Sequence, residues 1–150
     1  MNKSFKMIIP QKEHIHGIYE IEKLCFEHPQ SEQSLLNDLN GNSVFFCCVC
    51  ENGKVVGYIN ADTVLDEVYV INVCVHPHYR RQGIGERLVK ALRDYCRDNS
   101  FAFVTLEVRQ SNTAAISLYR KLGFEKAGLR KNFYTHPTED ADIMTLYFKR

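Results

Sequence analysis

Hydrophobic positions change their spacing several times along the chain, and each change marks an expected element. An apolar run at residues 5–9 predicts a short strand, and apolar residues then recur at helical spacing from about residue 11 to residue 25. Ser31, placed before a leucine-rich stretch, predicts the start of a second, shorter helix. Gly41 follows that stretch and marks its end.

The next segment is rich in β-branched and apolar residues. It runs from residue 43 to residue 77 and is interrupted by Asn52-Gly53, a dipeptide typical of a two-residue hairpin turn. This pattern predicts a meander of three antiparallel strands.

The second half of the chain alternates between helical and strand periods. Gly123 stands where a helix closes in the left-handed conformation. The expected elements are a helix ending near residue 99, a strand at 101–109, a helix at 112–122, and strands at about 125–130 and 142–149. The order β-α-α-β-β-β-α-β-α-β-β predicts a mixed α/β sheet of about seven strands with about four helices. The strand, helix, strand unit from Val70 to Arg109 is expected to be a right-handed parallel crossover.

Composition limits the class of protein. With 150 residues, 45% of them hydrophobic, the sequence fits one domain over residues 1–150. The 19 basic and 18 acidic residues nearly cancel, so we expect neither direct nucleic-acid binding nor a lipid-binding face. No apolar stretch approaches a membrane span or the core of a signal peptide, so a cytoplasmic protein without a membrane segment is expected.

Six cysteines lie mostly within apolar runs, and we expect them to be reduced thiols of the core. Cys47 and Cys50 form a C-x-x-C pattern. Because they lie in a predicted strand, their side chains point to opposite faces and cannot share a metal ion. No metal site is expected.

The basic stretch RRQGIG at residues 80–85 precedes a predicted helix and indicates an anion site built from backbone N–H groups. A dinucleotide fingerprint fails because Leu88 stands where a third glycine is needed. A mononucleotide P-loop fails because Glu86 and Arg87 follow Gly85. The phosphate therefore belongs to another kind of ligand.

The same hexapeptide resembles the pyrophosphate loop of the GNAT superfamily of acetyl-CoA-dependent N-acetyltransferases. Three tracts extend the resemblance, namely VLDEVYVINVCVHPHYRRQGIGERLVKAL, LEVRQSNTAAISLYRKLGF and RKNFYTHPTEDADIM. In this order they are similar to the bacterial ribosomal-protein alanine N-acetyltransferases, from about Cys25 onward. The resemblance implies the GNAT fold and acetyl transfer to a protein N-terminus within a ternary complex, with acetyl-CoA as cosubstrate and no metal.

The resemblance also implies a set of cofactor contacts. Backbone groups of one strand are expected to line the pantetheine and its thioester, and the loop amides to hold the pyrophosphate. Asn112 matches a family contact to the cofactor, although an asparagine there is also an ordinary helix N-cap. Whether Arg80 and Arg81 reach phosphate with their side chains stays open. The expected cofactor-binding residues are Val73, Cys74, Val75, Arg81, Gln82, Gly83, Ile84, Gly85, Glu86 and Asn112.

Two residues match the family's catalytic groups. Strand alternation places Glu107 on the face opposite Leu106 and Val108, and the resemblance assigns it as the general base. Tyr119 is assigned as the general acid at the departing sulfur; without the resemblance it reads as a core aromatic. Cys74 as a covalent nucleophile is a lesser alternative, because its strand position favours a buried thiol.

The acceptor side departs from the family pattern. Gln30 stands where a tryptophan is usual, and Phe133 replaces one of two tyrosines, while Tyr134 is kept as the expected acceptor contact. An α-amine loses its proton more readily than a lysine, by about 3 kcal/mol at neutral pH, which favours a protein N-terminus as the acceptor. The resemblance implies that this acceptor is the N-terminal alanine of a small-subunit ribosomal protein. The alternatives are a lysine or small-amine acetyltransferase, and an acyl-CoA-binding module without turnover.

Overall fold

The computed structural model describes residues 4–148 and places its strands in one sheet, in the order β1-β2-β3-β4-β5-β7-β6. The mixed α/β sheet predicted from the sequence is confirmed. The strands are β1 Lys6–Ile8, β2 Ser43–Val49, β3 Val55–Val64, β4 Glu67–Val75, β5 Phe103–Arg109, β6 Glu125–Tyr134 and β7 Glu139–Tyr147. The helices are α1 Ile15–Cys25, α2 Glu32–Leu39, α3 Ile84–Asp98 and α4 Thr113–Lys121, with 3-10 turns at Lys12–His14 and Pro77–Tyr79.

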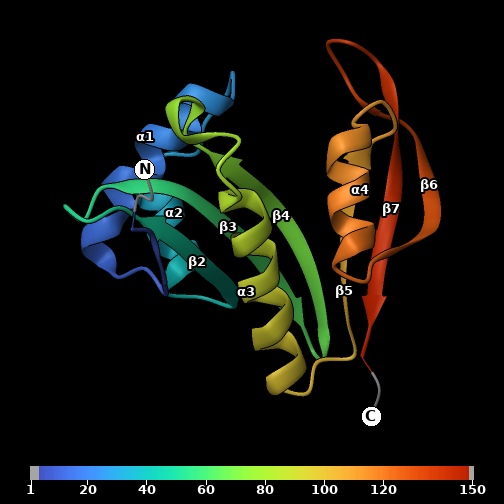
Figure 1. Cartoon of the computed structure of the whole chain (residues 1–150), viewed down its shortest axis with the longest axis horizontal. Coiled ribbons are helices and arrows are strands. Elements are labelled where there is room, and N and C mark those ends of the chain that lie inside the picture. Colours follow the sequence, from blue (N-terminus) through green and yellow to red (C-terminus); the bar gives the residue numbers. More distant parts are fainter. Residues whose placement is uncertain (1–3, 149–150) are drawn as a thin grey trace.

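Helices cover both faces of the sheet. Figure 1 shows α3 and α4 on the near side, with α1 and α2 behind β2 and β3. On the side of α3, a hydrophobic core packs Leu88 and Leu92 of that helix against strand residues such as Val104. On the side of α1 and α2, a second core packs Ile18 and Leu35 against the opposite face of the sheet. None of the helices within residues 4–148 is long and apolar enough to cross a bilayer.

The expected helix boundaries follow from local caps. Ser31 Oγ accepts a hydrogen bond from Ser34 N at 3.1 Å and starts α2, as predicted. Asn112 Oδ1 does the same for Ala115 N at 3.1 Å and starts α4. Gly123, with φ of 105°, ends α4 in the conformation that glycine adopts most easily.

Two sequence predictions need correction. The β2–β3 turn holds three residues rather than two, because Cys50 N bonds to Lys54 O at 3.0 Å and Gly53 takes the left-handed position. β6 continues past the predicted end at Arg130 to Tyr134, and β7 begins at Glu139 rather than at Asp142; the predicted end of the last strand, Lys149, lies outside the described residues. The added residues do not alternate between apolar and polar, and they are held by pairing across the β6–β7 hairpin and by the pairing of Ala141 with Arg109 of β5, so apolar alternation did not reveal them.

Strands β4 and β5 are parallel, as predicted, but pair only from Glu67↔Phe103 to Tyr69↔Thr105. Just beyond, β4 carries a bulge at Ile71, because Val70 pairs with Ala61 of β3 and Asn72 pairs with Asn60. Figure 1 shows β4 and β5 close together at one end and spreading apart toward the other. The sheet is therefore open between the second halves of these two strands.

Gly57 of β3 lets α3 start close to the sheet. A Cβ atom there would lie 3.1 Å from Cys74 O and 3.1 Å from Ile84 Cγ2. Glycine allows this approach without displacing either atom, and the first turn of α3 lies next to the open edge of β4.

Candidate active site

The loop between β4 and α3 contains two residues in the left-handed conformation and leads into the first turn of α3. Arg81 and Gly83 both have positive φ values, 64° and 77°, and Gly83 is the N-cap of α3. The first intrahelical bond runs from Arg87 N to Gly83 O at 3.1 Å. The N–H groups of the first three residues of α3 precede it and have no carbonyl one turn back. Together with the helix dipole, they form a site suited to an anion.

This helix start borders a cavity of about 750 Å³, called here the cofactor cavity. Most of the predicted cofactor-binding residues line it, namely Val73, Cys74, Val75, Arg81, Gly83, Ile84, Gly85 and Glu86. Gln82 and Asn112 lie outside its lining. For Asn112, the structure gives the capping bond to Ala115 and a position at a second cavity.

The two arginines of the loop differ. Arg80 Nε donates to Val75 O at 3.2 Å, and its Nη2 lies 3.7 Å from Cys25 Sγ. Arg80 therefore ties the loop to the end of β4 and to α1. Arg81 is exposed and borders the cofactor cavity, so its guanidinium is free to turn toward an anion.

A second cavity of about 520 Å³, called here the acceptor cavity, lies next to the first. Val73 and Phe26 border both cavities, so the two spaces meet at the open half of β4. Segments far apart in sequence form its walls, and Glu107, Tyr119 and Tyr134 are all among its lining residues. The two predicted catalytic residues and the predicted acceptor residue thus share one cavity.

Glu107 reaches the acceptor cavity because β5 alternates. Its neighbours Leu106 and Val108 are buried against α3, so the carboxylate faces the other way. Glu107 Oε1 lies 3.5 Å from Arg130 Nη1, and the two side chains are 31% and 55% exposed. A pair this open to water is weak. The carboxylate is accessible to a second cation.

Tyr119 comes from α4, on the other face of the sheet. Its ring packs 5.9 Å from that of Phe124, and burial raises the pKa of its hydroxyl to about 12, with a further contribution from Tyr134. The pKa of Tyr134 is raised by its own burial and by Glu107, and lowered by Arg109. Tyr119 is therefore neutral, and a hydrogen-bond donor, across the ordinary pH range.

Cys74 has the wrong environment for a nucleophile. Its side chain is buried against α1, and burial raises the pKa of the thiol to about 12. A thiol in this state carries almost no thiolate at neutral pH. Nearby, Tyr58 donates to the buried carboxylate of Glu22 at 2.6 Å. Cys74 therefore has the environment of a buried core thiol.

Sequence reasoning missed several features of the site. Phe26, at the α1–α2 junction, borders both cavities and stands one residue after a helical run that gave no reason to single it out. Gln30, at the position of the family's tryptophan, donates from its backbone to Glu22 Oε1 at 2.9 Å and holds this junction. Arg109 entered the sequence analysis only as the end of the unit from Val70 to Arg109. Its side chain bonds to the β6–β7 turn and lines the same cavity as Glu107.

Residues 15–124 match the profile of the acetyltransferase (GNAT) family. The ribosomal protein bS18-alanine N-acetyltransferase of Escherichia coli K12 is 39% identical over 85% of this chain and 87% of its own length. The crystal structure of the Escherichia coli ribosomal-protein-S18-alanine N-acetyltransferase superposes with a TM-score of 0.87, at 34% identity, over 98% of this chain and 96% of that one.

A more distant structure shares the fold. The phosphinothricin acetyltransferase of Sinorhizobium meliloti, solved in complex with AcCoA, superposes with a TM-score of 0.84 at 22% identity, covering 96% of this chain and 88% of that one. The family match spans most of the sequence, including the loop before α3 and both β5 and α4. The chain belongs to the acetyltransferase (GNAT) family.

Proposed function

We propose that this protein transfers an acetyl group from acetyl-CoA to the N-terminal alanine of ribosomal protein bS18. The observation that carries the proposal is the pair of adjoining cavities, one with an anion site and one with a carboxylate and a phenol. The relative in Escherichia coli, the ribosomal protein bS18-alanine N-acetyltransferase, supports the choice of acceptor. The reaction then belongs in the cytoplasm, where ribosomal proteins are made.

The cofactor cavity fits coenzyme A in its chemistry. The N–H groups of Ile84, Gly85 and Glu86 are placed to bind the pyrophosphate, with the Arg81 side chain nearby. The edge of β4 from Val73 to Val75 offers backbone groups to an extended amide chain such as pantetheine. Acetyl-CoA supplies an activated acetyl thioester when it is bound.

Different groups at the acceptor cavity carry out the proton removal and the hydrogen bonding that acetyl transfer requires. Glu107 takes a proton from the acceptor amine, so that the nitrogen lone pair forms the new N–C bond while the C–S bond breaks. The Tyr119 hydroxyl donates a hydrogen bond to the sulfur as its negative charge grows. A backbone N–H near Cys74 serves the carbonyl oxygen in the same way. The incoming amine replaces the Arg130 guanidinium as the partner of the Glu107 carboxylate.

The acceptor is expected to be an α-amine rather than a lysine. An α-amine titrates near pKa 8 and a lysine near 10.4, so a lysine costs about 3 kcal/mol more to deprotonate at neutral pH. Glu107 is a single carboxylate, and the described part of the cavity offers it no second base. The easier deprotonation therefore favours the N-terminal amine.

The test is mass spectrometry of acetylation on matched peptides. The panel contains an alanine N-terminus, other N-terminal residues, an N-blocked peptide with a lysine, and a polyamine. The proposal expects the alanine peptide to be acetylated at its N-terminus, with Glu107→Gln lowering kcat by about 10²- to 10⁴-fold. A preference for the lysine peptide or the polyamine would overturn the assignment of an N-terminal alanine as the acceptor. Binding of CoA without any turnover would indicate a non-catalytic module.

A further inference from the structure

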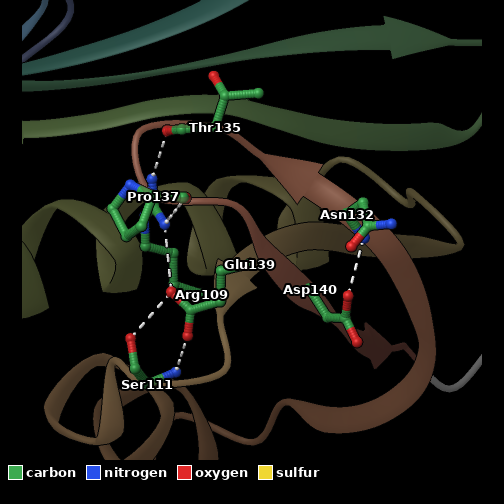
Figure 2. Close-up of polar contacts among 7 residues, drawn as sticks. All are labelled: Arg109, Ser111, Asn132, Thr135, Pro137, Glu139 and Asp140. Atoms are coloured by element: carbon green, nitrogen blue, oxygen red, sulfur yellow. Dashed lines mark hydrogen bonds and ion pairs between the residues drawn. The ribbon is translucent and has the colours of Figure 1, made fainter.

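Arg109, the last residue of β5, holds the turn between β6 and β7. Its Nη1 donates to Pro137 O at 3.0 Å and to Glu139 Oε1 at 3.2 Å, and its Nη2 donates to Thr135 O at 3.1 Å (Figure 2). The side chain is only 29% exposed. The contacts therefore join three points of the turn to the strand that carries Glu107.

Glu139 extends this connection to the start of α4. Its Oε2 accepts from Ser111 N at 2.7 Å and its Oε1 from Ser111 Oγ at 3.0 Å, as Figure 2 shows. The hydrogen bonds from Ser111, followed by those from Arg109, lower the pKa of Glu139, so it stays charged at working pH. One arginine and one carboxylate thus tie together β5, the α4 junction and the β6–β7 turn.

The same guanidinium fixes an aromatic wall of the acceptor cavity. The Arg109 Cζ atom lies 4.5 Å from the centre of the Tyr134 ring, and Phe133 packs edge-on against Tyr134 at 5.0 Å. Both aromatic residues line the acceptor cavity, whereas neither lines the cofactor cavity. Arg109 therefore contacts this aromatic wall directly, at Tyr134.

We propose that Arg109 is a positioning residue, which fixes the 132–140 turn and the Tyr134 ring so that the acceptor cavity is shaped before the acceptor binds. This inference rests on the proposed function of that cavity. The planar guanidinium reaches two carbonyls, a carboxylate and a ring face together. A lysine keeps the charge but presents no such fork. Arg109 acts on the acceptor through the turn and touches no reacting atom.

The test compares Arg109→Met and Arg109→Lys with wild type and with Arg97→Met, which removes an exposed arginine at the far end of α3. Hydrogen exchange followed by mass spectrometry is expected to speed up by about tenfold or more in residues 132–140 of both variants, and to stay unchanged in α3. With the alanine peptide, KM is expected to rise about 10- to 100-fold, with kcat within about threefold and the Kd of CoA unchanged.

The outcomes separate the two proposals. If wild type acetylates none of the peptides, the proposed function fails, and hydrogen exchange in the turn still decides whether Arg109 orders it. Unchanged exchange in Arg109→Met, or full retention of KM in Arg109→Lys, would overturn the positioning role. So would an equal loss of CoA affinity or faster exchange throughout the chain, since a general loss of folding moves all these quantities together.

Discussion

Replacing Tyr119 by phenylalanine removes one hydroxyl from the acceptor cavity and leaves the ring contact with Phe124, at 5.9 Å, in place. Burial raises the pKa of that hydroxyl to about 12. The departing thiol titrates near 8.5, so complete proton transfer to its thiolate is uphill by roughly 3.5 pKa units, or about 5 kcal/mol. The hydroxyl is therefore expected to act as a hydrogen-bond donor to the developing charge.

This role sets the magnitude of the effect. A hydrogen bond to a charged group contributes about 1.5–3 kcal/mol, so Tyr119→Phe is expected to lower kcat by about 10- to 150-fold. Because the pKa is raised rather than lowered, the hydroxyl keeps its proton as pH rises through 10. The kcat of wild type should then show no basic limb from this group below about pH 11.

Steady-state release of free thiol measures kcat, calorimetry measures the affinity for CoA, and thermal unfolding checks the fold. Tyr147→Phe is the matched control, since Tyr147 is 69% exposed and lines neither cavity. A loss of kcat smaller than about threefold would refute the hydrogen-bond role. A loss beyond about 10³-fold would exceed what one hydrogen bond contributes and would indicate complete proton transfer from Tyr119.

Three further predictions concern the frame around the site. Gly57→Ala is expected to destabilise the fold by about 1–3 kcal/mol in urea unfolding, because the added carbon meets Cys74 O and Ile84 at 3.1 Å each; an unchanged midpoint would contradict this. Glu22→Leu leaves the buried Tyr58 hydroxyl without a hydrogen-bond partner and is expected to lower the free energy of unfolding by about 2–4 kcal/mol. Glu22→Gln is expected to lower it by less, and equal losses in the two variants would contradict this prediction. Cys74→Ala is expected to keep kcat within about threefold of wild type. A much larger loss of kcat in this variant would support Cys74 as a covalent nucleophile.

Local signals in the sequence predicted most of the fold. The caps at Ser31 and Asn112, the left-handed glycine at 123 and the change of period at the start of α3 are properties of neighbouring residues, and the structure contains all of them. The alternation around Glu107 likewise predicted which way its side chain points. Each of these depends on forces that act within a few residues.

Other features of the site depend on contacts between distant segments. The bulge at Ile71 is defined by how β4 pairs with β3, and no residue type within β4 predicts it. Arg109 reads as one more exposed residue of a strand until the β6–β7 turn, some 26 to 30 residues away, folds back onto it. Gln30 replaces an expected aromatic residue, yet holds the same junction through its backbone. Register and backbone bonding of this kind leave no periodic pattern in the sequence.

The opening between β4 and β5 explains why both cavities occur at one place. Parallel pairing stops at Tyr69↔Thr105, and the bulge at Ile71 turns the rest of β4 away. Backbone groups from Asn72 to Val75 are then no longer paired with β5, so this edge can bond an extended ligand. The same opening lets Glu107 from one face of the sheet and Tyr119 from the other border a single cavity. Further pairing between β4 and β5 would occupy the β4 edge that an extended ligand needs, which gives a physical reason for the early end of this parallel pair.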